Sequence, residues 1–173
     1  LKHRRVKWGE YLWAFAKGYD ISPVAPMNHS NPIKSSGNSM TTYRDIESKE
    51  GAWQVILALS ESVCRRLREN GFMARTVQLS GRDKDLSWFE YQSKLDTPCC
   101  TAEAIAGPAM KLLCARYNFS TPLRSLGIRA CNLTDMSDVV QLMFGSDSLR
   151  QTRLEKIESC VDTLRGRFGR GAV

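Results

Sequence analysis

The amino-acid sequence predicts an α+β fold in which two helices cover one face of a four-stranded, mostly antiparallel sheet. Strand-like and helix-like segments follow one another in the order β-α-β-β-α-β, which is the order of the split βαβ arrangement. Apolar residues alternate in the strand-like segments and recur every three or four residues in the helix-like ones. A further amphipathic helix is expected near the C-terminus, and 173 residues suffice for one packed domain with extensions.

The N-terminal region predicts a short helix followed by a linker. Residues 8–17 place Leu12, Phe15 and Ala16 on one helical face, and Gly18 is a natural end for this helix. Residues 19–33 contain three prolines among asparagines and serines, a composition that forbids regular structure. We therefore expect the main domain to begin just beyond this linker.

The main domain is expected to open with a strand and a long helix. Residues 35–44 are rich in Ser, Thr and Gly but extended in pattern, which indicates a first strand. Ser48 is a suitable N-cap for the following helix, and Gly71 is a suitable end. The apolar residues of this helix repeat at three- and four-residue steps: Trp53, Ile56, Leu57, Val63, Cys64 and Leu67.

Three further strands complete the predicted sheet. Residues 73–82 and 87–95 alternate in polarity and are joined by the charged turn 83–85, a pattern typical of a β-hairpin. Residues 124–133 are predicted to form the last strand.

Two more helices are expected. Pro98 and Thr101 introduce the first of them, which ends before Pro122. Its predicted buried side consists of Ile105, Ala109, Leu112 and Leu113. The second is a separate amphipathic helix over residues 149–168, with a single apolar stripe made of Leu154, Ile157, Val161, Leu164 and Phe168.

Composition narrows the class of protein. Hydrophobic residues make up 42% and charged residues 25% of the chain, as in an ordinary soluble globular protein. No apolar run approaches 18 residues and no signal peptide is evident, so we expect a cytoplasmic protein without a membrane span. A chain that starts with Leu1 rather than Met indicates a fragment of a longer protein.

The six cysteines predict neither a disulfide framework nor a metal site. They are scattered through a chain with enough apolar residues to fold unaided, which favours reduced thiols. Cys99 and Cys100 are adjacent rather than spaced as a CxxC pair, and His3 and His29 lie far from any cysteine cluster. No zinc template matches this spacing, and we expect no metal in the fragment.

The alternation of the strands also predicts what the uncovered face of the sheet presents. Side chains opposite the apolar set point to that face, and they are mostly hydroxyls, amides and a few basic residues, with Glu90 the one acid among them. Together with a net charge of +7, this composition favours contact with the phosphate backbone of a nucleic acid.

Four segments resemble one protein family. Residues 34–46 read KSSGNSMTTYRDI and resemble the K-S-x-G-x-S-x-T-x-x-x-D segment of bacterial Y-family translesion DNA polymerases of the DinB/UmuC type. Residues 9–24 resemble the end of the family's thumb domain, G-x-x-L-W-x-x-A-x-G-x-D-x-x-P-V. Residues 124–133 resemble the strand R-x-L-G-V-x-x-x-x-L, and residues 167–169 resemble the R-F-G ending common in Gram-positive members.

The resemblance implies a division of the chain and a role for each part. Residues 1–18 would be the end of the thumb domain, 19–33 a linker, 34–135 the βαββαβ little-finger domain and 136–173 a C-terminal tail. In the family, the little finger grips the phosphates of primer-template DNA. Catalysis there needs Mg²⁺ bound by palm-domain carboxylates, which this fragment lacks, so we expect the parent chain to polymerise DNA and the fragment to be inactive.

We predict DNA contacts at ten residues and a second partner in the tail. The predicted DNA-contacting residues are Ser35, Gly37, Ser39, Thr42, Arg44, Gln78, Ser80, Arg82, Lys94 and Arg129. Family members often carry a Q-L-x-L-F peptide that binds the sliding clamp after the last strand. Here Gln141, Leu142, Met143 and Phe144 occupy that place, one residue shorter, so they form either a clamp motif or a hydrophobic plug on the domain itself.

Two other functions are compatible with parts of the pattern. An RNA-recognition module has the same element order, but it requires a glycine-containing aromatic run that the strand bearing Trp88, Phe89 and Tyr91 lacks. A cysteine-dependent enzyme would need a histidine base near the nucleophile, and both histidines lie in the N-terminal tail and linker.

Overall fold

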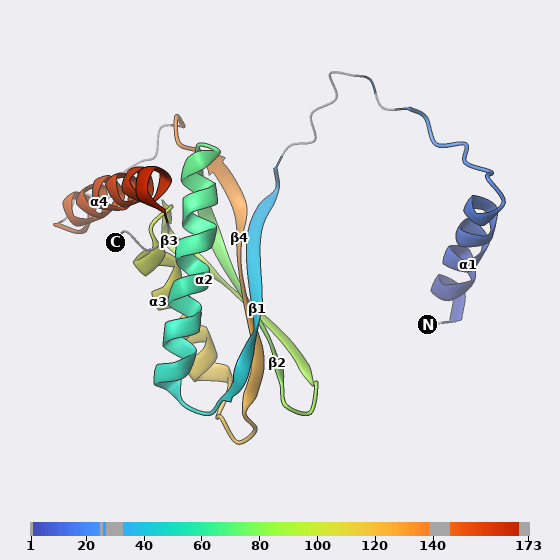
Figure 1. Ribbon diagram of the computed structural model, residues 1–173, viewed down its shortest axis with the longest axis horizontal. Coiled ribbons are helices and arrows are strands. Elements are labelled where there is room, and N and C mark those ends of the chain that lie inside the picture. The colour runs from blue at the N-terminus through green and yellow to red at the C-terminus, as the bar shows by residue number, and fades with distance from the viewer. Residues whose placement is uncertain (1, 25, 27–32, 139–145, 170–173) are drawn as a thin grey trace. The chain divides into compact units, whose positions relative to one another are not determined.

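The computed structural model describes residues 2–24, 26, 33–138 and 146–169. The chain divides into two compact units, residues 1–32 and residues 33–173. Figure 1 shows the chain coloured from blue at the N-terminus to red at the C-terminus.

The first unit consists of α1 (Lys2–Ala16) and an extended segment after it. Gly18 adopts a positive φ of 79°, and the N–H of Tyr19 donates to the carbonyl of Ala14 at 3.0 Å, which satisfies the end of the helix. The ammonium of Lys17 lies 3.8 Å from the centre of the Trp13 ring. Trp8, like Trp13, is more than half exposed, so this unit buries little apolar surface of its own.

The second unit is the predicted α+β domain, and the sheet order explains its topology. The four strands lie in the order β1-β4-β2-β3, and all neighbouring strands are antiparallel. Their bounds are β1 Ser35–Ile46, β2 Phe72–Asp83, β3 Trp88–Cys99 and β4 Leu123–Asp135. Each covering helix, α2 (Lys49–Glu69) or α3 (Ala102–Arg116), joins two strands that run the same way with a third strand between them.

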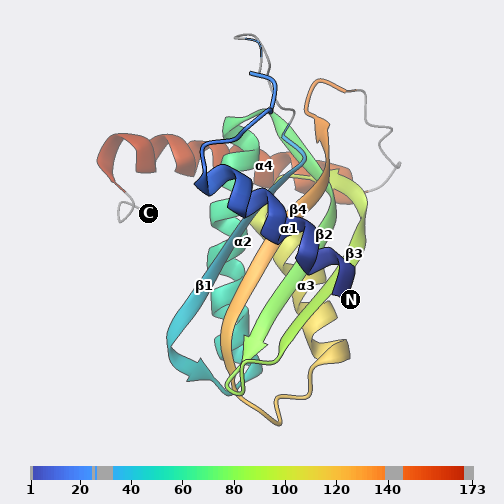
Figure 2. The same cartoon turned by 90° about the vertical axis from the view of Figure 1, so that its right-hand side faces the viewer.

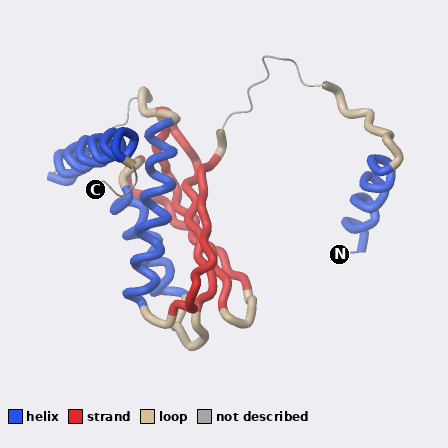
Figure 3. Tube along the Cα trace, viewed as in Figure 1, coloured by secondary structure: helices blue, strands red, loops and turns tan. Residues whose placement is uncertain are grey.

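Within this unit, the helices α2 and α3 pack on one face of the sheet and leave the other without a covering layer (Figure 3). Figure 2 shows the four strands side by side. The core lies between these two layers. From the sheet it contains Val77, Leu79, Leu126, Ile128 and Ala130, and from the helices Ile56, Val63, Leu67, Ile105 and Leu113. Burial of these side chains is the main favourable term in folding the domain.

The predicted helix signals of α2 are confirmed at both ends. The side-chain oxygen of Ser48 accepts a hydrogen bond from the N–H of Gly51 at 3.1 Å. Gly71 follows the helix with a φ of 71°, a left-handed conformation that suits a residue without a side chain. These two residues define α2 within a few positions.

Strand β3 is longer than the sequence predicted, because it continues through Pro98 to Cys99. The pairing with β2 shifts register between Ala74 and Thr76, so additional residues of β3 are accommodated opposite a short stretch of β2. Since β3 is an edge strand, a proline at this irregularity removes no interior ladder bond. Proline therefore lies within the strand instead of ending it.

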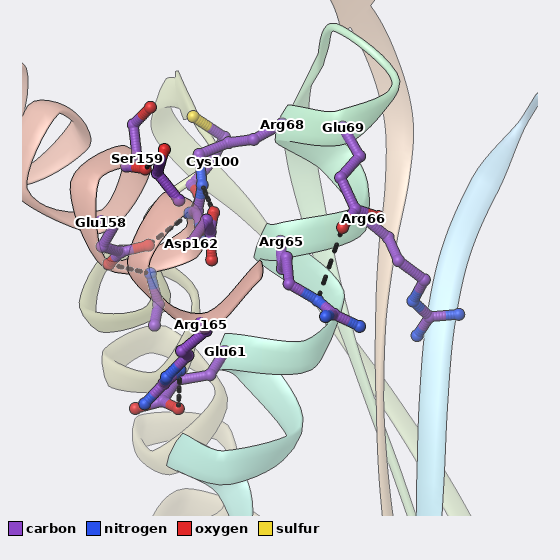
Figure 4. A network of polar contacts seen from close by, with 12 residues as sticks. Glu61, Arg65, Arg66, Arg68, Glu69, Cys100, Glu158, Ser159, Asp162 and Arg165 are labelled. Atoms are coloured by element: carbon purple, nitrogen blue, oxygen red, sulfur yellow. Dashed lines mark hydrogen bonds and ion pairs between the residues drawn. The ribbon is translucent and has the colours of Figure 1, made fainter. Parts of the chain in front are cut away.

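The C-terminal helix α4 (Ser146–Phe168) docks on the helical layer through polar side chains (Figure 4). Arg68 of α2 pairs with both Glu158 and Asp162 of α4. Glu158 also accepts a hydrogen bond at 2.8 Å from the N–H of Ala102, the first residue of α3. Since the N-cap Thr101 makes no side-chain capping bond, the carboxylate of α4 satisfies the start of α3.

Burial and pairing affect the charges of this junction in different ways. Burial raises the pKa of the Glu158 carboxyl, and the hydrogen bond from Ala102 and the charge of Arg68 only partly offset it. Burial also disfavours the charged form of Arg68, but its bond to Asp162 and the nearby carboxylates outweigh this, so its pKa is raised. Arg68 therefore stays cationic and holds the carboxylates of α4 in place.

We expect Arg68→Ala to lower the free energy of unfolding by roughly 1–3 kcal/mol, since it leaves partly buried carboxylates without their cation. The matched control is Arg65→Ala, whose 3.7 Å contact with Glu69 is exposed and should change stability by less than about 1 kcal/mol. Urea unfolding followed by circular dichroism measures both. Equal effects of the two substitutions would show that α4 is not anchored through Arg68.

Three of the six thiols are buried, two are exposed and one, that of Cys131, is partly exposed. Burial raises the pKa of both Cys99 and Cys100 to about 12 and raises the pKa of Cys64 well above its usual range, whereas Cys114 and Cys160 are exposed. At pH 8 we expect a thiol-specific disulfide reagent to modify Cys114 and Cys160 first, because only the thiolate reacts.

The same shift has a consequence at alkaline pH. These thiols have a higher pKa in the folded state than in the unfolded state, so folding keeps them protonated. Their contribution to the free energy of unfolding is fully present below about pH 9 and is lost as the pH rises towards 12. Alkaline unfolding should therefore occur at higher pH in a Cys100→Ala variant than in the parent. Fast labelling of all six cysteines in the native state would contradict the buried assignment.

Candidate nucleic-acid interface

The uncovered face of the sheet consists of four rows of side chains that the strand pairings define. Each row runs across β1, β4, β2 and β3 in that order. The rows are Ser35, Cys131, Thr76, Lys94; then Gly37, Arg129, Gln78, Gln92; then Ser39, Gly127, Ser80, Glu90; and finally Thr41, Ser125, Arg82, Trp88. We call these sixteen positions the open face.

Eight of the ten residues predicted to contact DNA lie in these rows: Ser35, Gly37, Ser39, Gln78, Ser80, Arg82, Lys94 and Arg129. The intervening positions of β2 and β4 belong to the core, so the alternation that the sequence indicated is confirmed there. Hydroxyls, amides and basic side chains from four strands are thereby brought together on one surface.

Thr42 and Arg44 are not in these rows, which corrects their predicted placement. Thr41 faces Ser125 in the last row, and the pairing of β1 with β4 then shifts register before Ile46. The Thr42 hydroxyl donates to the backbone carbonyl of Arg124 at 3.2 Å, so it is engaged within the sheet. Simple alternation from Ser35 through Ser39 leads to Thr41, and this was the signal available in the sequence.

Gln78 lies on the open face but is almost fully buried by its neighbours, at 7% exposure. Its side-chain oxygen accepts hydrogen bonds from Gln92 at 3.3 Å and from the Cys131 thiol at 3.5 Å. Gln78 therefore holds the neighbouring side chains in position, and Gln92, which is exposed, presents the amide at the surface.

Two glycines keep the middle of the open face flat. A Cβ on Gly127 would lie 2.6 Å from the Ser80 hydroxyl and 3.1 Å from the Ser39 Cβ, so no side chain fits there without movement. Gly37 is similarly crowded by the side chain of Arg129. A glycine inside a strand permits another molecule to approach the backbone closely, which suits contact with phosphates.

The basic residues of the open face are available for an external anion. Among the described residues, no carboxylate lies within ion-pair distance of Arg82, Lys94 or Arg129. Arg82 lies 5.6 Å from the ring centre of Trp88, which is 58% exposed. The last row of the open face thus forms a cationic, partly aromatic surface at one end of the sheet, made of Thr41, Ser125, Arg82 and Trp88.

A shallow cleft of about 260 Å³ marks the centre of this surface. It is lined by Arg129, Ser80 and Ser39 together with Trp88 and Glu90. At its margin, burial raises the pKa of the Cys131 thiol, with the charge of Arg129 opposing the shift, so this thiol is neutral at physiological pH. The hydroxyls, amides and guanidinium of this lining offer hydrogen bonds and charge to a bound molecule.

Other classes of site are not formed by the described part of the chain. No group of three metal-ligating side chains comes together among those residues. None of the described helices is long and apolar enough to cross a lipid bilayer. The predicted clamp-binding residues Gln141, Leu142, Met143 and Phe144 lie outside the described residues.

Comparison with known proteins assigns a family to this combination of a split βαβ sheet and a polar, basic open face. Residues 33–144 match the impB/mucB/samB family C-terminal domain. Because this match covers more than half of the chain, the protein belongs to that family.

Similar proteins include two curated bacterial polymerases. The chain is 41% identical to DNA polymerase IV of Acetivibrio thermocellus over 163 residues, which is 94% of this chain and 41% of that protein. It is 33% identical to DNA polymerase IV 2 of Bacillus subtilis, over 98% of this chain and 41% of that protein. The chain thus spans about two fifths of the length of these relatives.

A solved structure supports the fold. The little-finger domain of PolIV, in a complex with a β-clamp processivity factor, matches with a TM-score of 0.50 and 18% identity. The match covers 64% of this chain and 98% of the other chain. At this identity the likeness establishes the little-finger fold alone.

Proposed function

We propose that this chain is the DNA-gripping C-terminal part of a Y-family translesion DNA polymerase, and that its open face binds the phosphates of primer-template DNA. The observation that carries the proposal is the unpaired basic and hydroxyl-rich open face in a member of this family. Hydroxyls, exposed backbone groups and arginines contact phosphate oxygens without reading base edges. The grip is therefore independent of sequence, as a polymerase that follows any template requires.

The proposed catalytic activity belongs to the parent protein. Its relatives are DNA polymerases of which this chain spans about two fifths, and we infer that the Mg²⁺-binding carboxylates lie in the remainder. We propose that the fragment binds DNA without polymerising it. Its contribution to the parent enzyme is to hold the duplex near the site of chemistry.

The RNA-binding alternative is weaker because the strand aromatics are engaged elsewhere. Phe89 stacks on Tyr91 with ring centres 5.3 Å apart, and it also contacts Tyr117 after α3 at 5.2 Å. Phe89 pairs with Gly81 and Tyr91 with Leu79, so both aromatic rings lie on the face of the sheet that the helices cover. Of the three aromatics of β3, Trp88 alone lies on the open face, whereas RNA-recognition domains stack two or three bases on aromatics of their strands.

We expect the fragment to bind duplex DNA at low salt, and the Arg82→Ala, Lys94→Ala double variant to bind more weakly. Each lost phosphate contact should reduce the slope of log affinity against log salt by about one, so the double variant should lose about two. Fluorescence anisotropy over a salt series, with two unrelated duplex sequences, measures this effect.

The matched control is Lys111→Ala, which removes an exposed lysine on α3 in the helical layer, away from the open face. It should leave both affinity and salt slope unchanged. No binding of the parent fragment at low ionic strength, or an equal loss in the control, would overturn the proposed interface.

We propose that residues 141–144 dock on the bacterial sliding clamp. The comparison structure pairs a PolIV little finger with a β-clamp, and this chain carries Gln141, Leu142, Met143 and Phe144 after β4. A second weak contact would raise the effective concentration of a distributive polymerase at the primer end. Gln141 would supply hydrogen bonds and the other three residues apolar anchors.

A Gln141→Ala, Phe144→Ala variant should lose clamp binding in surface plasmon resonance while keeping its DNA affinity and melting temperature. The control is Arg153→Ala, an exposed substitution on α4. A lower melting temperature of the double variant, with no clamp binding by the parent fragment, would instead show that the segment is a structural plug.

A further inference from the structure

A second cleft, larger than the one on the open face, lies at the β1 edge of the sheet. Its volume is about 480 Å³. It is bounded by the start of β1, the end of α2, two residues of β4 and the first residue of β2. Its polar lining consists of Ser35, Ser36, Arg66, Asn70 and Arg129. None of the predicted interface residues comes from α2, so Arg66 is an addition to the sequence-based set.

Arg66 is fixed in an orientation that reaches the sheet. Its Nη2 donates to the carbonyl of Gly37 at 2.9 Å, and its Nε donates to the carbonyl of Ser62 at 3.3 Å. Figure 4 shows the side chain extending from α2 towards β1, away from the ion-pair network that holds α4. The guanidinium is therefore positioned in advance, with further N–H groups left over.

Arg129 reaches the same residue from β4. A Cβ on Gly37 would lie 3.1 Å from both Cβ and Cγ of Arg129 and 3.2 Å from its Nε. The arginine stem thus lies directly against Gly37, and any larger residue would displace it. Gly37 is therefore contacted by two arginines: Arg129 of β4 packs along its Cα, and Arg66 of α2 donates to its carbonyl.

Neither arginine has a counter-ion in the protein. Within the described part of the chain, no carboxylate comes within ion-pair distance of Arg66 or Arg129. Other arginines of the domain do have one, since Arg65, Arg68, Arg124 and Arg165 each contact an acid. Two unneutralised guanidiniums beside serine hydroxyls constitute a site for a phosphate group, which arginine binds bidentately.

We infer that Arg66 and Arg129 together bind one backbone phosphate of the DNA, so that the interface continues from the open face around β1 onto α2. The inference rests on the proposed DNA-binding function. Gly37 and Arg129 line both clefts, so a strand whose phosphates lie along the open face reaches the β1 edge without a break. A free phosphate or nucleotide offers the same chemistry, and the experiment below distinguishes these sources.

The test compares Arg66→Gln and Arg66→Ala with Arg65→Ala in the fragment, using anisotropy on duplex DNA over a salt series. Both Arg66 variants should weaken binding on every sequence and reduce the salt slope by about one. Arg65, one position earlier on α2 and already in contact with Glu69, should have no effect. The glutamine variant retains a donor for the Gly37 carbonyl, so it separates loss of charge from loss of the strand contact.

A double-mutant cycle with Arg129→Gln tests whether the two arginines hold the same phosphate. If they do, Arg129→Gln should weaken DNA binding much less in the Arg66→Gln background than in the parent fragment. Fully additive losses of affinity would overturn the shared site. Circular dichroism melting of each variant shows whether the fold is retained. A normal DNA affinity and slope in a folded Arg66→Gln variant would refute the inference while leaving the proposed function intact.

The source of the phosphate is tested by NMR, following the amide of Gly37. Titration with duplex DNA should shift this signal in the parent fragment and not in Arg66→Gln. Titration with inorganic phosphate at constant ionic strength should shift it only weakly. A strong shift with inorganic phosphate alone, together with unchanged DNA binding in Arg66→Gln, would identify a free-anion site and overturn the assignment to DNA. If the parent fragment shows no DNA binding at all, the proposed function itself fails.

Discussion

Alternate side chains of β2 and β4 are buried beneath α2 and α3, and this burial is the constraint on which the rest of the domain depends. Val77, Leu79 and Ile128 must point towards the helices, because their transfer from water is the main driving force for folding. Strict alternation then directs the intervening residues, including Ser80 and Arg129, to the opposite side. The polar open face is therefore the geometric consequence of the core, and any slip of register would exchange the two sets.

The open face also contains glycines that lower the stability of the strands and that packing of the core does not require. Glycine within a strand lowers stability by about 0.5–1 kcal/mol relative to alanine, yet Gly37 and Gly127 occupy the two middle rows of the open face. At Gly127 the space is taken by Ser39 and Ser80, and at Gly37 it is taken by Arg129. Packing of these polar groups against bare backbone gives a surface that is flat and rich in hydrogen-bonding groups, as approach of a phosphate chain demands.

The sequence predicted the element order, both ends of α2 and eight of the ten open-face placements, because those features depend on local pattern. It failed at Thr42 and Arg44, although alternation from Ser39 leads to Thr41 instead, and at Pro98, which an edge-strand irregularity accommodates. Such irregularities arise from the pairing of distant strands and leave no periodic signal. The role of Arg66 was also inaccessible, since helical spacing does not reveal that its side chain reaches the carbonyl of Gly37.

The docking of α4 links the tail to the domain without using the open face. Glu158 of α4 satisfies the start of α3 and pairs with Arg68 of α2, so α4 lies on the helical layer, beyond the helices and away from the uncovered side of the sheet (Figure 1). The proposed clamp segment follows β4 and precedes α4 in sequence, and both of these elements belong to the same compact unit. A partner captured by that segment would be held at the domain by two fixed ends. None of the sixteen open-face positions belongs to residues 141–144, so the proposed clamp contact and the proposed phosphate grip would use different residues.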